Sequence, residues 1–197
     1  HRLHGILADD MGLGKTIQAI VGVRAIYEES EEKAHILIVC PKSVIKHWVR
    51  EVKKAFPSKR DLICEYIGPS RRRFYQRFYD ARRWIFITTY DTLTRDIEDL
   101  RDKKFFAVIL DEATYIKNPR TNRAEAVRKL SALHRLALTG TPMENRPLEL
   151  WSIFDFLMRG LLGSCKLFKE IEAGILQDSE EAKEWLVERN FEEMSRD

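Results

Sequence analysis

The chain has 197 residues, of which 44% are hydrophobic and 33% are charged, a balance typical of a globular domain. Its net charge of +3 is uneven: residues 170–197 hold ten acidic and three basic residues, so the rest carries an excess of about ten positive charges. No apolar run is long enough to span a bilayer, no signal-peptide pattern opens the chain, and the three cysteines lie far apart, which together exclude membrane-spanning and disulfide-rich proteins and favour an intracellular location.

Short apolar runs alternate with segments of helical periodicity along the chain. The predicted strands are residues 5–8, 36–40, 62–67, 84–88, 106–110 and 135–138. The predicted helices carry apolar residues at helical spacing in four sets: Ile17, Ile20, Val21 and Ala25; Ile45, Trp48, Val49, Val52 and Phe56; Phe74, Tyr75, Phe78 and Tyr79; and Ala124, Val127 and Leu130. This alternation predicts an α/β fold in which helices flank a mostly parallel sheet.

Ligands bind beyond the carboxyl ends of the strands in such sheets, and the first strand is followed there by ADDMGLGKT, residues 8–16. Two glycines let the backbone fold around a phosphate with its N–H groups pointing inward, the lysine reaches the β- and γ-phosphates, and the threonine hydroxyl ligates Mg²⁺. Asp9 stands where the common pattern has a glycine. The alternative is a structural turn. The predicted ATP-binding loop consists of Asp10, Met11, Gly12, Leu13, Gly14, Lys15 and Thr16.

Two carboxylates, Asp111 and Glu112, follow the strand at residues 106–110. Paired carboxylates at a strand end suit metal-assisted phosphoryl transfer, in which Asp111 holds Mg²⁺ and Glu112 polarises the attacking water. The alternative is a helix N-cap with a solvated neighbour. A phosphate-binding loop at the same edge of the sheet favours the catalytic interpretation of Lys15, Asp111 and Glu112.

Three further strand ends carry small polar groups. LTGTPMEN, residues 138–145, places Thr139, Gly140 and Thr141 at the same edge, either as nucleotide-responsive groups or as a turn chosen for its glycine and proline. Lys42 and Ser43 precede one helix, and Thr89 and Tyr90 open another. Both helix starts suit DNA phosphates or ordinary helix capping, and the basic excess suits a nucleic-acid partner or a solvated surface.

Taken together, these segments resemble the N-terminal motor lobe of Swi/Snf-family ATPases, a branch of the second helicase superfamily. The similar segments, in order, are GILADDMGLGKTIQAI (motif I), LIVCPKSVIKHWVREVKKAF (Ia), IFITTYDTLTRD (Ib), VILDEATYIKN (II) and RLALTGTPMENRPLELWSIFDFL (III). LLGSCKLF resembles the segment that leads into the family's helical protrusion. Lys117 and Asn118, after the acidic pair, favour this family over RNA helicases with a DEAD box.

The resemblance implies a RecA-like P-loop NTPase lobe over residues 1–160 and the start of a helical protrusion over residues 161–197. It implies that Lys15 and Thr16 bind ATP and Mg²⁺, that Asp111 and Glu112 serve hydrolysis, and that Thr139 and Thr141 link the nucleotide state to lobe movement. It places Lys42, Ser43, Thr89 and Tyr90 along a double-stranded DNA track.

The family generally translocates on duplex DNA without separating its strands and remodels nucleosomes or other DNA-bound proteins. We therefore expect an intracellular DNA-stimulated ATPase, nuclear in a eukaryote and in the cytoplasm or nucleoid of a prokaryote, with no membrane partner. Two alternatives stay open, namely a DNA- or partner-binding module that has lost turnover and an RNA helicase of the same superfamily.

The chain also departs from the family pattern. The upstream segment whose glutamine reads adenine, and the second RecA-like lobe with its arginine fingers, lie outside residues 1–197, so hydrolysis is expected to need that second lobe. Position 114 is threonine, where the family usually has histidine or glutamine. This departure predicts looser coupling between hydrolysis and DNA, because a threonine hydroxyl reaches fewer partners.

Overall fold

A computed structural model of the chain describes residues 3–10, 12–31, 34–80, 82–142 and 146–175. Its centre is one six-stranded sheet with the order β1-β6-β5-β2-β4-β3, and every neighbouring pair is parallel. The strands are β1 (His4–Leu7), β2 (His35–Val39), β3 (Ile63–Glu65), β4 (Ile85–Thr88), β5 (Lys104–Leu110) and β6 (Ser131–Leu138). The predicted α/β class with a parallel sheet is confirmed.

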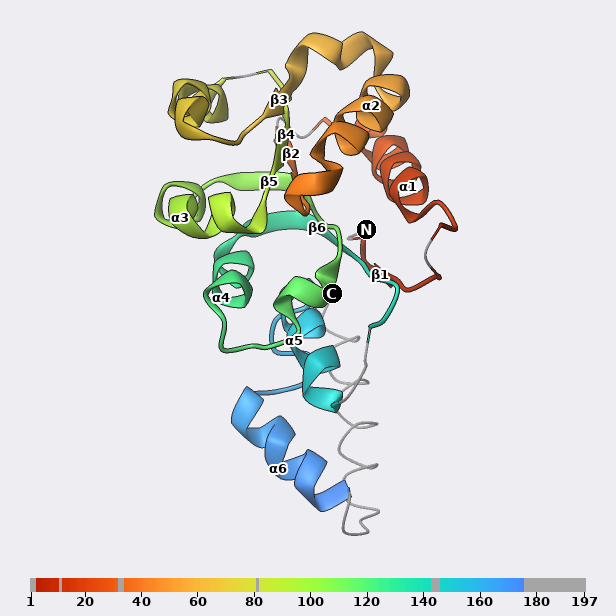
Figure 1. Cartoon of the computed structure of the whole chain (residues 1–197), viewed down its shortest axis with the longest axis vertical. Helices are drawn as coiled ribbons and strands as arrows, with labels where there is room; N and C mark the ends of the chain where they lie inside the picture. Colours follow the sequence, from red (N-terminus) through yellow and green to blue (C-terminus); the bar gives the residue numbers. More distant parts are fainter. Residues whose placement is uncertain (1–2, 11, 32–33, 81, 143–145, 176–197) are drawn as a thin grey trace.

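Helices cover both faces of this sheet (Figure 1). The α-helices are α1 (Lys15–Glu29), α2 (Ile45–Ala55), α3 (Tyr90–Leu100), α4 (Asn122–Lys129), α5 (Pro147–Leu157) and α6 (Cys165–Ile175). Short 3₁₀ segments are η1 (Lys42–Val44), η2 (Pro57–Leu62), η3 (Pro69–Tyr79) and η4 (Ala113–Ile116). Helices α1 and α2 pack on one face, and α3, α4 and α5 pack on the other.

The central strands are buried on both faces, which explains their continuous apolar sequences. Alternate residues of β2 face opposite layers: Leu37 and Val39 pack with α3, whereas Ile36 and Ile38 pack with α1 and α2. One apolar core thus packs on each face of the sheet. These two cores fix the positions of the strand ends, where the polar motifs of the sequence begin.

Strand register aligns those ends at one edge. Leu7 of β1 pairs with Leu138 of β6, Leu110 of β5 pairs with Val39 of β2, and Val39 pairs in turn with Thr88 of β4. The ladder continues into the loops, because the Asp111 amide donates to the Val39 carbonyl at 2.8 Å. The segments predicted to carry chemistry therefore emerge side by side.

Two predicted helical faces differ from the structure. In α1 the buried residues are Ala19, Ile20, Val23 and Tyr27. Ile17 and Val21, predicted to be part of the buried face, are 54% and 57% exposed. The helix has apolar residues on two sides. The side that contains Tyr27 faces the sheet, where the Tyr27 ring packs against Phe106.

The aromatic set of residues 74–79 lies on a 3₁₀ segment, not on an α-helix. With three residues per turn, Tyr75 and Phe78 share the inner face and Tyr79 is rotated outward. Phe78 is accordingly 6% exposed and Tyr79 63% exposed. The outward tyrosine lies under the Lys103 ammonium, which is 3.3 Å from the ring centroid.

Beyond the sheet, α5 and α6 extend from the end of β6 (Figure 1). Gly160 and Gly163 have positive φ values of 88° and 68° in the turn between them, a conformation that favours glycine. The Trp151 indole ties α5 to this turn by donating to the Gly163 carbonyl at 3.2 Å. Most of the predicted protrusion, residues 176–197, lies outside the described residues. Within the described part, no helix is both long and apolar enough to cross a membrane.

Candidate nucleotide and nucleic-acid site

The loop after β1 has the backbone shape that a phosphate site needs. Gly12 and Gly14 adopt positive φ values of 88° and 76°, which a side chain would strain. Gly14 also stands at the N-cap of α1, whose start has neither a side-chain cap nor an acidic residue in its first turn. The positive end of this helix is therefore presented by backbone N–H groups alone, an arrangement suited to an anion. Met11 lies outside the described residues.

Lys15 closes the loop on itself. Its ammonium donates to the carbonyl oxygens of Asp9 at 2.6 Å and Asp10 at 2.9 Å. Gln18 supports the same loop, since its amide donates to the Leu13 carbonyl at 3.1 Å. The lysine lies at the start of α1 beside the glycines, so it can exchange these neutral acceptors for a more strongly attracting anion.

Asp111 is held at the centre of this edge by two donors. The Trp48 indole N–H donates to Oδ2 at 2.6 Å, and the Glu112 amide donates to Oδ1 at 3.0 Å. Burial raises the pKa of the Asp111 carboxyl, while these two donors and the positive charge of Lys15 oppose that rise. The carboxylate is therefore oriented and lies within electrostatic reach of the phosphate loop.

Glu112 adopts a left-handed backbone conformation with φ 51° and ψ 60°. Among the described residues it is the only non-glycine with positive φ. Such strain is found preferentially at functional sites. The turn directs consecutive residues differently, because Asp111 continues the sheet ladder while Glu112 is the N-cap of η4.

Tyr90 connects motif Ib to motif II. Its hydroxyl donates to the Asp111 carbonyl at 2.8 Å, and its ring stacks on Tyr115 with centroids 5.0 Å apart. Burial raises the pKa of Tyr90 well above its usual value, so the phenol stays protonated as a donor. Tyr90 is only 2% exposed, so its side chain supports the acidic motif from within the fold, and its DNA contact stays a prediction.

The other predicted DNA contacts lie at helix starts. Lys42 and Ser43 are exposed on η1, directly after β2. Thr89 caps α3: its hydroxyl accepts from the Thr92 amide at 3.1 Å and donates to the Thr92 hydroxyl at 2.9 Å. The capping alternative therefore describes Thr89 in this structure, while the DNA contacts of Lys42, Ser43 and Thr89 stay predictions.

The loop after β6 is joined to both acidic and phosphate motifs. The Thr139 amide donates to the Leu7 carbonyl at 3.1 Å, which anchors it beside the phosphate loop. The Thr141 amide donates to the Thr139 hydroxyl at 3.1 Å across Gly140. On the other side, the Lys117 ammonium donates to the Thr141 hydroxyl at 3.5 Å and pairs with Glu149 at 3.6 Å.

Thr114, by contrast, makes a local contact. Its hydroxyl donates to the Glu112 carbonyl two residues earlier at 3.4 Å. The predicted coupling set therefore divides into two parts. Thr139, Gly140 and Thr141 lie together, and Lys117 joins them to motif II, whereas the Thr114 contact stays within its own turn.

Sequence reasoning missed two side chains of this site. Trp48 was predicted only as part of an apolar helix face, and Lys117 only as a marker of family resemblance. A buried indole N–H needs an acceptor, so the chain did contain a signal for the first. Lys117 is 9% exposed, and its partners depend on how α5 packs, which periodicity does not reveal.

The chain is similar to several known proteins. A family model described as SNF2-related domain matches residues 1–189. The chain is 40% identical to the TATA-binding protein-associated factor mot1 of Schizosaccharomyces pombe, over 96% of the chain and 10% of that protein. It is 43% identical to a putative ATP-dependent helicase/translocase, YwqA, of Bacillus subtilis, over 80% of the chain and 17% of that protein.

The solved structures include the Sulfolobus solfataricus SWI2/SNF2 ATPase core in complex with double-stranded DNA. Its TM-score is 0.77 at 38% identity, over 95% of this chain and 38% of that one. A second structure, of the Sulfolobus solfataricus SWI2/SNF2 ATPase core domain, has a TM-score of 0.70 at 36% identity, over 93% of this chain and 37% of that one. The chain thus spans a tenth to a sixth of the two curated relatives it matches.

Proposed function

Because the chain belongs to the SNF2-related family, we propose that it is the ATP-binding lobe of a motor that moves along double-stranded DNA. The observation that carries this proposal is the meeting of the phosphate loop, the Asp111–Glu112 pair and the Thr139–Thr141 loop at one edge of the sheet. The DNA-bound structure of the Sulfolobus relative supports duplex DNA as the nucleic acid.

The nucleotide site fits ATP and Mg²⁺ in its charge and shape. The strained glycines and uncapped start of α1 suit the phosphates, and Lys15 would exchange its two backbone acceptors for phosphate oxygens. Thr16 and Asp111 would hold Mg²⁺, which when bound neutralises phosphate charge. The two donors on Asp111 suit this role, since groups behind a metal ligand fix its orientation.

Glu112 would orient and polarise the attacking water as general base. Its left-handed backbone sets the direction of its side chain independently of Asp111. Hydrolysis further needs positive charge opposite the nucleotide, which a second RecA-like lobe would supply as arginine fingers. Losing such a finger typically costs on the order of 10³–10⁵ in rate, so we propose that residues 1–160 act only together with that lobe.

Coupling would run through the loop after β6. The Thr139 amide is hydrogen-bonded to Leu7 of β1, the strand that precedes the phosphate loop, and Thr141 contacts Lys117 of motif II. Lys117 in turn holds Glu149 at the start of α5. A change at the nucleotide can therefore reach α5, and through it α6, by contiguous contacts.

DNA would lie across the helix starts after β2 and β4. Lys42 and Ser43 are exposed there, and Thr89 caps the neighbouring helix. Phosphate contacts at helix starts hold a duplex without reading its sequence. Such contacts suit a translocase that remodels nucleosomes or other DNA-bound proteins inside the cell.

The experiment is the ATPase rate of the full-length protein without nucleic acid and with duplex DNA, single-stranded DNA or RNA. We expect duplex DNA to stimulate most, and Glu112→Gln to abolish stimulated turnover while nucleotide binding is retained. Strongest stimulation by RNA would replace this proposal with an RNA helicase. A wild-type protein that binds duplex DNA without any turnover would indicate a binding module.

A further inference from the structure

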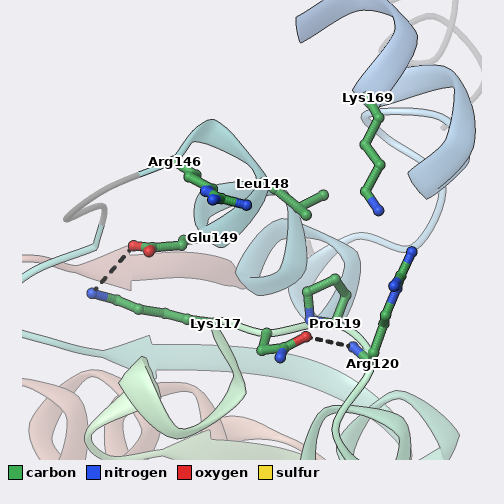
Figure 2. Close-up of a pocket in the computed structure, with 8 residues that line it drawn as sticks. Lys117, Pro119, Arg120, Arg146, Leu148, Glu149 and Lys169 are labelled. Atoms are coloured by element: carbon green, nitrogen blue, oxygen red, sulfur yellow. Dashed lines mark hydrogen bonds and ion pairs between the residues drawn. The ribbon is translucent and has the colours of Figure 1, made fainter. Parts of the chain in front are cut away.

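A hollow of about 370 Å³ opens beside the nucleotide edge, between the segment after motif II, the start of α5 and helix α6. We call it the basic hollow. Its lining residues are Lys117, Asn118, Pro119, Arg120, Arg146, Leu148, Glu149 and Lys169. Figure 2 shows that the Arg120 guanidinium and the Lys169 ammonium extend toward each other from different segments, with Pro119 and Leu148 as apolar walls.

The charges of the basic hollow are unbalanced. Among the described residues that line it there are four cations and one carboxylate, and that carboxylate, Glu149, pairs with Lys117 at 3.6 Å (Figure 2). Within the described ranges, no carboxylate lies within 4.0 Å of the Arg120, Arg146 or Lys169 side-chain nitrogens. Glu170, the neighbour of Lys169, pairs with Lys166 instead.

The backbone under these cations is ordered by its own hydrogen bonds. The Asn118 carboxamide oxygen accepts from the Arg120 amide at 3.0 Å, and the Thr121 hydroxyl donates to the Asn118 carbonyl at 3.0 Å. The Glu149 amide donates to the Arg146 carbonyl at 3.0 Å. The segments that carry Arg120 and Arg146 are therefore ordered locally, and an anion that enters the hollow would relieve the repulsion among the cations that line it.

Its position indicates which anion. Arg120 lines both the basic hollow and a neighbouring hollow formed by Asp91, Thr94 and Arg95 of α3. Helix α3 is the one that Thr89 caps, so the two hollows continue the surface assigned to DNA above. A polyanion with repeated charges can follow this line, and guanidinium groups match phosphate oxygens in two-pronged geometry.

We infer that the basic hollow binds backbone phosphates of the duplex, through Arg120, Arg146 and Lys169, and so extends the DNA contact from α3 to α6. This inference rests on the proposed function. Through Lys169, helix α6 would contact the DNA directly, next to the Lys117–Glu149 pair that joins motif II to α5. Arg120, Arg146 and Lys169 make no base contacts in this arrangement, so their effect is independent of sequence.

The test is the salt dependence of duplex binding by the full-length protein. The variant carries Arg120→Gln, Arg146→Gln and Lys169→Gln. The matched control carries Lys53→Gln, Arg60→Gln and Lys104→Gln, three exposed cations toward the opposite edge of the sheet. Since each phosphate contact contributes about 0.9 to the slope of log K against log salt, the variant should lower the slope by about two to three units and the control by much less.

Thermal melting checks that both proteins are folded. A variant whose slope equals that of the wild type, while the wild type binds DNA, overturns the inference and leaves the proposed function intact. A wild type that binds no duplex fails the proposed function itself. A polyglutamate peptide is the second probe. If the variant loses binding of this peptide but binds duplex DNA as the wild type does, the hollow binds an acidic polypeptide and the inference on DNA is wrong.

Discussion

Replacing Trp48 with phenylalanine removes one hydrogen bond to Asp111, the predicted Mg²⁺ ligand. The indole is fully buried on α2, and its N–H donates to Asp111 Oδ2 at 2.6 Å. Phenylalanine keeps an aromatic ring in this position but has no donor. Asp111 would then keep the Glu112 amide on Oδ1 alone, and its side chain would be free to rotate away from the geometry that Mg²⁺ needs.

The size of the effect follows from that single bond. Hydrogen bonds to charged groups contribute about 1.5–3 kcal/mol, and loss of a group that orients a metal ligand typically costs about 10–100-fold in metal affinity or activity. We therefore expect Trp48→Phe to raise the Mg²⁺ concentration needed for half-maximal ATPase by about 10–100-fold. Nucleotide binding measured in EDTA should change little, because the phosphate loop is not altered.

The assay is a Mg²⁺ titration of DNA-stimulated ATPase in the full-length protein, with calorimetric nucleotide binding at high and zero Mg²⁺. Trp84→Phe is the control. Trp84 is also buried, at 3% exposed, but it precedes β4 at the opposite edge of the sheet, so it reports the loss of a buried indole that does not contact Asp111. If the two variants give the same Mg²⁺ dependence, the indole does not position Asp111.

Three other changes test separate parts of the account. Thr114→His should increase stimulation by DNA at unchanged ATP affinity, because the threonine hydroxyl reaches only its own turn; lost activity would mean that the site is built around threonine. Lys117→Met should lower DNA stimulation more than nucleotide affinity and destabilise the fold by about 1–3 kcal/mol, since it leaves Glu149 without this partner; equal losses in melting and in both activities would contradict a coupling role. Burial lowers the pKa of His35, so the unfolded chain takes up a proton first and stability should fall as pH drops below about 6.5; melting of His35→Gln between pH 7 and 5.5 should show a smaller decrease, and an identical one would refute this.

The sheet and its functional edge could be predicted from the sequence because both depend on local patterns. β-Branched runs such as Ile36–Val39 identify buried strands, and parallel order brings their carboxyl ends together. The positions of Lys15 and Asp111 at one edge follow from that rule. The order and spacing of the motifs also predict the family, and the family model confirms it.

The parts that could not be predicted depend on tertiary packing. Helix α1 offers two apolar sides, and only its contact with Phe106 decides that Ile17 and Val21 face outward. The Tyr90 hydroxyl follows β4 and reaches the carbonyl of Asp111, which follows β5, across the end of β2; this contact depends on the strand order of the sheet. The basic hollow likewise combines three segments that are distant in sequence, so no window of the chain reveals it.

Displacement of a third strand from triplex DNA tests the central claim most directly, because a motor that tracks along a duplex removes that strand without separating the other two. With ATP, the full-length wild-type protein should release the third strand and leave the duplex intact. Glu112→Gln, which removes the proposed general base, should bind the same DNA and release nothing. Equal release by both proteins, or DNA-stimulated hydrolysis by the wild type without any release, would contradict the account.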